Sequence, residues 1–380
     1  MNSANAPLSG IRIVEFAGIG PGPFAGMMLA DMGAEVLRVD RQGPGRSPDP
    51  RKDITLRGRQ SITLNLKEPR AVEVALRLVG QADALTEGYR PGVMEGLGLG
   101  PDVCLARNPK LVYGRMTGWG QTGPLASAAG HDINYISLSG ALWAMGERDR
   151  NPMPPLNLVG DFGGGGMVFA FGLLCALLRA RETGEGDIVD AAICDGAAAL
   201  MAPVYGYIAR GIWENLRQAN FLDGAAPYYG VYQCLDGKWI SIGPLEPQFY
   251  ALLVDLLDLR PEDIGERADT ARWAEQRERF AEVFRRRTRD DWCARLEGTD
   301  VCFAPVLDLE EAPNHPHNRA RAIFVEAHGA VQPAPAPRFA RAATPLPGPP
   351  PAPGEHNGTA LPAWGFDDGE VADLRTAGII

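Results

Sequence analysis

Residues 11–40 set the architecture. They read Ile11-Arg-Ile-Val-Glu-Phe16, then Ala17-Gly-Ile-Gly-Pro-Gly-Pro23 and, after an apolar stretch that ends at Gly33, Glu35-Val-Leu-Arg-Val-Asp40. The two aliphatic runs predict strands, the segment rich in glycine and proline predicts a turn, and residues 24–32 have helical spacing. Two parallel strands joined by a short helix predict an open α/β sheet that binds ligands near the carboxyl ends of its strands.

The same alternation continues along the chain. Residues 70–81 have helical spacing, and residues 84–87 and 111–116 are strand-like. An apolar helix follows around Met167 to Leu178, and a further strand and helix are predicted over residues 187–208. The pattern predicts one large α/β domain over residues 1–210.

The pattern changes after residue 220. Residues 228–234 and 238–242 predict a β-hairpin across Asp236-Gly237. Charged helices are expected over residues 247–259, 271–287 and 290–296. Residues 220–325 are therefore predicted to form a smaller α+β domain. Residues 330–380 form a proline-rich return segment, whose final short helix is expected to pack on the large domain.

Composition narrows the classes of function. The net charge of −10 argues against nucleic-acid binding, and no apolar run is long enough for a membrane span. The six cysteines form no C-x-x-C pair, which argues against structural disulfides and a metal site and favours a reducing cytoplasm.

One local basic patch stands out on this acidic chain, with nine Lys or Arg against four acids between residues 38 and 70. Its members are Arg38, Arg41, Arg46, Arg51, Lys52, Arg57, Arg59, Lys67 and Arg70. Such a patch predicts either a site for a small polyanionic ligand or a solvated surface without a function.

Four features are candidates for chemistry. The turn at Gly18 resembles a dinucleotide-binding loop only in part, because Pro23 occupies the position of its third glycine. His131 lies in a glycine-flanked loop beside Asp132, and histidine suits proton transfer at neutral pH. Asp161 precedes four glycines at a helix start, and Glu246 lies between a strand and a helix. A structural histidine and capping carboxylates are the alternatives.

Seven segments, taken together, resemble the family III coenzyme A transferases, and within them the α-methylacyl-CoA racemase branch. They are Ala17-Gly-Ile-Gly-Pro-Gly-Pro23, Leu37-Arg-Val-Asp-Arg41, Glu87-Gly-Tyr-Arg-Pro-Gly-Val93, Met116-Thr-Gly-Trp-Gly-Gln-Thr-Gly-Pro124, Gly130-His-Asp-Ile-Asn-Tyr135, Asn157-Leu-Val-Gly-Asp-Phe162 and Leu245-Glu-Pro-Gln-Phe-Tyr250. The resemblance covers nearly the whole chain.

The resemblance implies a Rossmann-like large domain, a smaller domain and an interlocked homodimer. It also implies that the coenzyme A part of the substrate lies on the large domain. The residues it assigns to coenzyme A binding are Ile19, Arg41, Leu64, Asn65, Leu66, Lys67, Gly88, Tyr89, Arg90, Gly130, Asp132 and Tyr135. One departure is Gly96, where some racemases carry an arginine.

The activity implied is inversion of the α-carbon of a 2-methylacyl-CoA by His131 and Asp161, with Glu246 bonded to His131. Glu246 begins the small domain, so either chain of a dimer could supply it. No resident cofactor or metal is expected, because coenzyme A arrives as part of the substrate. A coenzyme A transferase that uses Asp161 as nucleophile is the alternative; a nicotinamide-dependent oxidoreductase and a non-catalytic binding protein are further ones.

Overall fold

The computed structural model describes residues 5–43, 49–344 and 346–380. The chain divides into two compact units. The first contains the described residues up to Ala141, together with Pro155–Met201 and Ala322–Ile380, and the second contains Leu142–Pro154 and Ala202–Arg321. Residues 1–210 were predicted to form one large domain, whereas Leu142–Pro154 and the segment that begins at Ala202 belong to the second unit.

The first unit is built on six strands: β1 (Arg12–Phe16), β2 (Glu35–Arg41), β3 (Arg59–Leu64), β4 (Ala84–Glu87), β5 (Val112–Thr117) and β6 (Asp187–Ala192). They pair in parallel throughout, in the order β3-β2-β1-β4-β5-β6. The predicted α/β class with a parallel sheet is confirmed. The edge strand β3 was not predicted, because its sequence falls within the basic patch.

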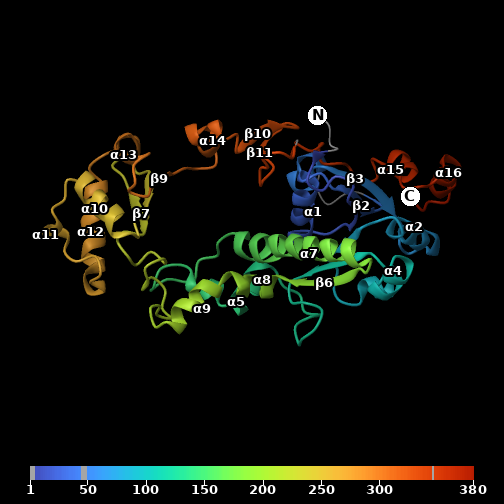
Figure 1. Ribbon diagram of the computed structural model, residues 1–380, viewed down its shortest axis with the longest axis horizontal. Helices are drawn as coiled ribbons and strands as arrows, with labels where there is room; N and C mark the ends of the chain where they lie inside the picture. Colours follow the sequence, from blue (N-terminus) through green and yellow to red (C-terminus); the bar gives the residue numbers. More distant parts are fainter. Residues whose placement is uncertain (1–4, 44–48, 345) are drawn as a thin grey trace. The chain divides into compact units, whose positions relative to one another are not determined.

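Helices cover both faces of this sheet (Figure 1). One face packs on α2 (Pro69–Val79), α3 (Val93–Gly96), α4 (Pro101–Arg107), α15 (Asn357–Ala363) and α16 (Asp368–Thr376). The other face packs on α1 (Pro21–Asp31), α5 (Asp132–Leu138) and α7 (Val168–Thr183). Strand positions alternate between the two cores: Ile13 faces α1 and α7, whereas Val14 faces α2.

The C-terminal segment covers the edge of the sheet. The backbone N–H of Ser61 donates to Nδ1 of His356 (3.1 Å), and that of Thr63 donates to Oδ1 of Asn357 (2.9 Å). These bonds occupy edge groups of β3 that would otherwise be open to another chain. In Figure 1 the red helices α15 and α16 accordingly lie beside β2, β3 and α2.

Asp161 lies in an unusual helix. Residues Leu158–Met167 form a wide-turn π-helix that continues directly into α7, whereas the four glycines after Asp161 predict a helix that starts there. The combined stretch Leu158–Thr183 is long and apolar enough to cross a membrane by length and composition. A core helix meets the same criteria, and Phe169, Leu173 and Leu177 of α7 lie in the interior of the unit.

The wide helix packs on α8 (Ile193–Leu200) at a contact between two backbones. A Cβ atom on Gly196 would lie 1.8 Å from the carbonyl oxygen of Gly164, and one on Gly164 would lie 2.5 Å from the nitrogen of Ala197. Glycine is therefore needed at both positions, because any side chain would push the two helices apart.

Gly196→Ala should destabilise the protein by about 3 kcal/mol or more, because overpacking against backbone cannot be relieved by a rotamer change. Thermal or urea unfolding measures the effect. Gly206→Ala is the matched control in α9 (Ala202–Ala209), since nothing lies within 4 Å of its Cβ position. Equal stability of the two variants would contradict the close backbone contact.

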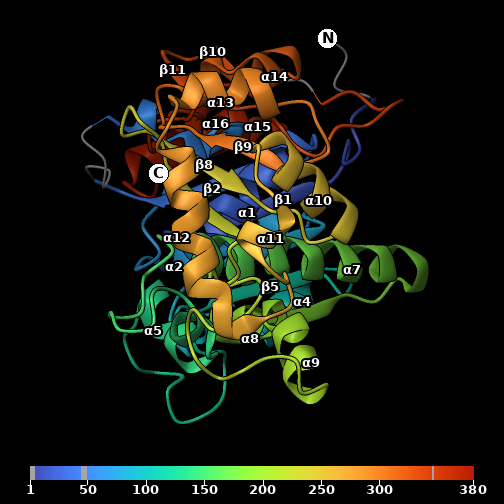
Figure 2. The same cartoon turned by 90° about the vertical axis from the view of Figure 1, so that its left-hand side faces the viewer.

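The second unit contains an antiparallel sheet of β7 (Gly230–Gln233), β8 (Trp239–Ile242) and β9 (Phe303–Val306). The β7–β8 pair is the hairpin predicted across Asp236-Gly237. Helices α10 (Pro247–Leu256), α12 (Trp273–Phe284) and α13 (Arg289–Leu296) pack on one face of this sheet through a shared apolar core (Figure 2).

The remaining elements are short. They are α6 (Ala141–Ala144), α11 (Pro261–Ile264), α14 (Pro316–Ala320) and the hairpin of β10 (Phe324–Ala327) and β11 (Ala330–Pro333).

Candidate active site

The strand order locates a crevice at the carboxyl edge of the large sheet. Successive strands run outward from β1 in one direction as β2 and β3, and from β4 in the other direction as β5 and β6. The connections therefore diverge between β1 and β4, and a ligand crevice is expected at such a point. The loop Ala17–Gly20 follows β1 there, and Gly88–Arg90 follows β4.

Asp161 lies against the first of these loops and is held by two polar contacts. A Cβ atom on Gly20 would lie 3.3 Å from Oδ2 of Asp161. The backbone N–H of Asp161 donates to Oδ1 of the buried Asp132 (2.8 Å), and Nδ2 of Asn157 donates to Oδ2 of Asp161 (3.3 Å). Asn157 was not singled out from the sequence, although its spacing of four residues from Asp161 was a usable signal.

The backbone N–H of Asp161 is already bonded to Asp132, so it is not available to a ligand. Asp132 was expected to contact coenzyme A. Asp132 is 8% exposed, and its Oδ1 holds the backbone of Asp161. Asp132 therefore supports the position of Asp161, and its contact with coenzyme A stays a prediction.

His131 is the residue that precedes α5, directly before Asp132. It is exposed, and its backbone N–H donates to Oδ1 of Asn134 (3.0 Å). Tyr135 packs edge-on against Trp119 and donates its hydroxyl to the carbonyl of Gly130, which fixes the turn before His131. His131 therefore starts a well-anchored helix rather than lying in a free loop.

The surroundings of Asp161 favour its protonated form. Burial raises the pKa of this carboxyl most strongly, and the nearby carboxylate of Asp132 raises it further. Two effects act in the opposite direction: the hydrogen bond from Asn157 and the positive charge of a protonated His131 both lower the pKa of Asp161. His131 is thus close enough to Asp161 to interact electrostatically, and the structure brings both residues into the same unit.

Three exposed cations follow the carboxyl ends of neighbouring strands. Arg41 is the last residue of β2, Lys67 lies three residues after β3, and Arg90 lies three residues after β4. Within the described part of the chain, no acid forms an ion pair with any of them. Unpaired cations at one edge of a sheet suit a ligand with several phosphates.

The rest of the basic patch is mostly engaged internally. Arg38 and Arg59 are buried and pair with Glu15, and Arg57 is buried and pairs with Asp31. Arg51, Lys52 and Arg70 pair with surface acids. Arg46 lies outside the described residues. The patch is therefore much smaller than its composition suggests.

Residues 8–357 match the CoA-transferase family III. The chain belongs to this family. It is 43% identical to "Alpha-methylacyl-CoA racemase" of Mus musculus and 41% identical to the protein of that name of Homo sapiens, in each case over 98% of this chain and 97% of the relative. A crystal structure of a CAIB/BAIF family protein from Brucella suis superposes with a TM-score of 0.79 at 28% identity, covering 94% of this chain and 99% of that chain.

The match to family III confirms the resemblance read from the seven segments. Of the residues expected to bind coenzyme A, Ile19, Arg41, Lys67, Gly88 and Arg90 are exposed. Leu64 is 2% exposed and belongs to the sheet core, so only its backbone is accessible to a ligand. Gly96 ends α3 on the surface, and nothing lies within 4 Å of its Cβ position, so an arginine would fit there.

Glu246, the third predicted catalytic residue, belongs to the second unit of this family III chain. It precedes Pro247 at the start of α10 and is exposed, and its side chain makes no capping hydrogen bond. Its carboxylate is near enough to Cys302 to add to the effect of burial, which raises the pKa of that thiol.

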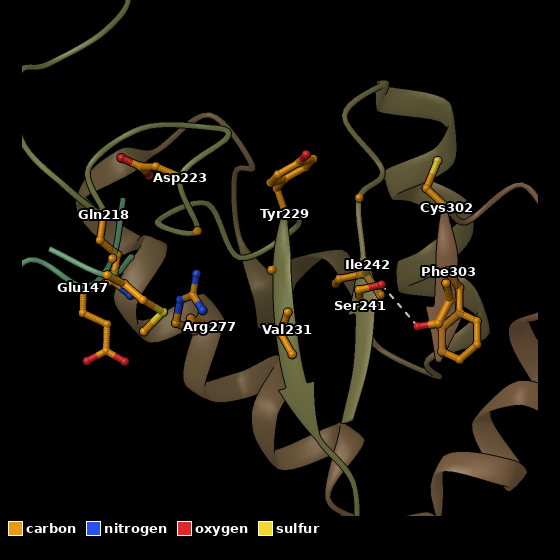
Figure 3. A pocket seen from close by; sticks show the side chains of 16 residues that line it. Glu147, Gln218, Asp223, Tyr229, Val231, Ser241, Ile242, Arg277, Cys302 and Phe303 are labelled. Atoms are coloured by element: carbon orange, nitrogen blue, oxygen red, sulfur yellow. Dashed lines mark hydrogen bonds between the residues drawn. The ribbon is translucent and has the colours of Figure 1, made fainter. Parts of the chain in front are cut away.

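A hollow of about 810 Å³ lies over the β7–β8–β9 sheet, and Arg277 of α12 is among the residues that line it. Val231, Ser241 and Ala304 are neighbours across the three strands and line this hollow, together with Tyr229. Figure 3 shows the side chains of Val231, Ser241 and Tyr229. Met153 also lines this hollow. Gly243 and Cys302 also line the hollow, and Cys302 is near Glu246.

Proposed function

We propose that this chain is an α-methylacyl-CoA racemase, which inverts the α-carbon of 2-methylacyl-CoA thioesters by proton transfer. The observation that carries the proposal is the environment of Asp161: a half-buried carboxyl with a raised pKa, anchored by Asp132 and Asn157 and within electrostatic range of His131. The names of the relatives at 41–43% identity support the same reaction.

The reaction needs one base and one acid on opposite faces of the α-carbon. With a substrate of one configuration, the neutral His131 takes the α-proton while the protonated Asp161 donates its proton to the other face. With the opposite configuration, the Asp161 carboxylate takes the proton and the imidazolium returns one. The raised pKa of Asp161 serves this exchange, because this carboxyl must carry a proton when it acts as the acid.

Glu246 completes the proposed set. A carboxylate hydrogen-bonded to His131 would set the imidazole tautomer and support its charged form. Its position at a helix start, without a capping bond, leaves its oxygens open to such a partner. The interlocked homodimer belongs to the same proposal, since a second chain could supply this residue.

The coenzyme A part of the substrate is proposed to lie along the carboxyl edge of the large sheet, with its phosphates near Arg41, Lys67 and Arg90. The loops at Ile19 and at Gly88 would bring its thioester end toward Asp161. No resident cofactor is proposed, because coenzyme A is a part of the substrate. A cytoplasmic location is the setting we propose.

The deciding experiment is exchange of the α-proton. (R)- and (S)-2-methylacyl-CoA are incubated separately with the enzyme in heavy water, without a second substrate. Both should acquire deuterium at the α-carbon and converge to the same mixture. Absence of exchange at high enzyme concentration would defeat the proposal.

The alternative is a coenzyme A transferase, a reading that the family name keeps open. In that reaction Asp161 attacks the thioester carbonyl, expels the coenzyme A thiolate and forms a mixed anhydride. Hydroxylamine would then trap Asp161 as a hydroxamate, and turnover would require an acceptor carboxylic acid. Trapping without α-proton exchange would favour the transferase.

Arg41→Ala should raise the KM for acyl-CoA about tenfold and change kcat little, because a phosphate contact far from the α-carbon stabilises substrate and transition state alike. Steady-state kinetics with one enantiomer measures both constants. Arg375→Ala, at an exposed position of α16, is a charge-matched control. A defect confined to kcat would contradict a phosphate-binding role for Arg41.

A further inference from the structure

The loop Gly88–Gly92 has a glycine at each end, where the backbone can adopt many conformations, whereas Pro91 restricts its middle. It contains Gly88 and Gly92, the latter with a φ of +85°, and it connects β4 to the short helix α3. Such a loop is costly to order when a ligand binds, unless the protein orders it beforehand. Because the loop lies beside the crevice, its conformation before binding affects the affinity for a ligand.

One guanidinium fixes both ends of this loop. Arg115 of β5 is 7% exposed, and its Nε donates to Oε1 of Glu87 (3.0 Å), the residue directly before the loop. Its two terminal nitrogens donate to both carboxylate oxygens of Glu95 on α3 (2.8 and 3.2 Å), beyond the loop. Glu87 and Arg115 are also directly opposite each other in the β4–β5 pairing.

The second oxygen of Glu87 reaches into the loop itself. The backbone N–H of Tyr89 donates to Oε2 of Glu87 (2.7 Å), which fixes the chain one residue before Arg90. The backbone N–H of Val93 then donates to the carbonyl of Arg90 (3.1 Å), which closes the loop on its far side. Glu87 is 3% exposed, so it acts on a ligand only through this backbone.

We propose that Glu87, Arg115 and Glu95 form a staple that holds the Gly88–Gly92 loop in its coenzyme A-binding conformation. They are positioning residues, which act through Tyr89 and Arg90 and do not touch the substrate. The inference rests on the proposed function, since it takes this loop to bind coenzyme A.

A buried ion pair by itself would suggest only a contribution to folding. The staple differs because its outer member, Glu95, has a side chain that is 44% exposed. The carboxylate of Glu95 is in contact with solvent, and the buried Arg115 keeps Glu87 as its counter-charge, so removing the charge of Glu95 should cost little stability. An effect of Glu95 on ligand affinity would therefore report the conformation of the loop and not the stability of the protein.

The test measures the dissociation constant of free coenzyme A by calorimetry for the wild type, Glu87→Gln and Glu95→Gln. Affinity should fall about tenfold in Glu87→Gln, which loses a charge-assisted bond to Arg115, and about threefold in Glu95→Gln. In racemisation the same variants should raise KM and leave kcat at saturation within about twofold. Combining Glu87→Gln with Arg115→Gln should give less than the sum of the separate effects, because the two residues act as one unit.

Asp31→Asn is the matched control. Asp31 is also a buried, ion-paired carboxylate, bonded to Arg57, but it ends α1 at the edge of the sheet opposite the crevice. It should lose stability without losing affinity for coenzyme A.

The outcomes separate the two proposals. Unchanged affinity in both Glu87→Gln and Glu95→Gln, with an active wild type, overturns the staple and leaves the racemase proposal intact. If Glu87→Gln does not fold, the affinity of Glu95→Gln decides alone: a weakened one supports the staple and an unchanged one overturns it. A wild type that binds no coenzyme A refutes the function together with the staple.

Discussion

Replacing His131 by alanine should lower racemisation about a thousandfold or more while coenzyme A binding stays unchanged. General acid–base groups contribute about 10²- to 10⁴-fold each, and inversion requires both members of the pair. Because His131 contacts α5 through its backbone N–H, which alanine retains, the start of the helix should persist. Polarimetry or chiral chromatography of the acyl group measures inversion, and fluorescence or calorimetry measures coenzyme A affinity.

The variant should also lose symmetry between the two enantiomers. Asp161 can still remove the α-proton on its own face and return a deuteron from heavy water with retention of configuration. One enantiomer should therefore exchange slowly without inverting, and the other should not exchange. His317→Ala, an exposed histidine on α14, is the control that should behave like the wild type. Normal inversion in His131→Ala would remove this residue from the mechanism.

The sheet was predictable wherever strands were apolar and bounded by turn-formers, as at β1, β2 and β4. Strand β3 was not predicted. It begins with a charge in a basic region and reads Arg59-Gln-Ser-Ile-Thr-Leu64. Arg59 is nevertheless buried, since Glu15 of β1 supplies its counter-charge across two strands. A buried ion pair depends on a partner far away in the sequence, so local composition suggested a surface patch instead.

The candidate site, too, could be predicted only in part from the sequence. The sequence pointed to Asp161 and His131 through their glycine-rich surroundings, but not to the way they are held. Asp132 was expected to face coenzyme A, and its bond to the backbone N–H of Asp161 was not predicted. That contact arises because Gly160 leaves room for it: a Cβ there would lie 2.1 Å from Oδ1 of Asp132. Such a fit between two segments has no local signature.

Asp161→Asn should also lower inversion about a thousandfold, with exchange retained for the enantiomer opposite to the one that His131→Ala retains. An amide has nearly the shape of the carboxyl group, and Asp132 holds the backbone of residue 161, so the site should keep its geometry. The amide, however, can neither take the α-proton nor return a proton to the α-carbon. Asp102→Asn, in the exposed first turn of α4, is the control. Exchange of the same enantiomer in both single variants would contradict a two-sided mechanism.

The pH profile gives an independent view of the same pair. Inversion requires that His131 and Asp161 share one proton, since two protons leave no base and none leaves no acid, so the wild-type rate should fall at both low and high pH. Burial raises the pKa of Asp161, which places the acidic limb at a higher pH than an exposed aspartate would give.

In Asp161→Asn only His131 remains as the base. With a base and no acid required, the residual exchange should fall at low pH and should reach a plateau at high pH. Exchange that still declines at high pH in this variant would mean that the missing acid was not Asp161.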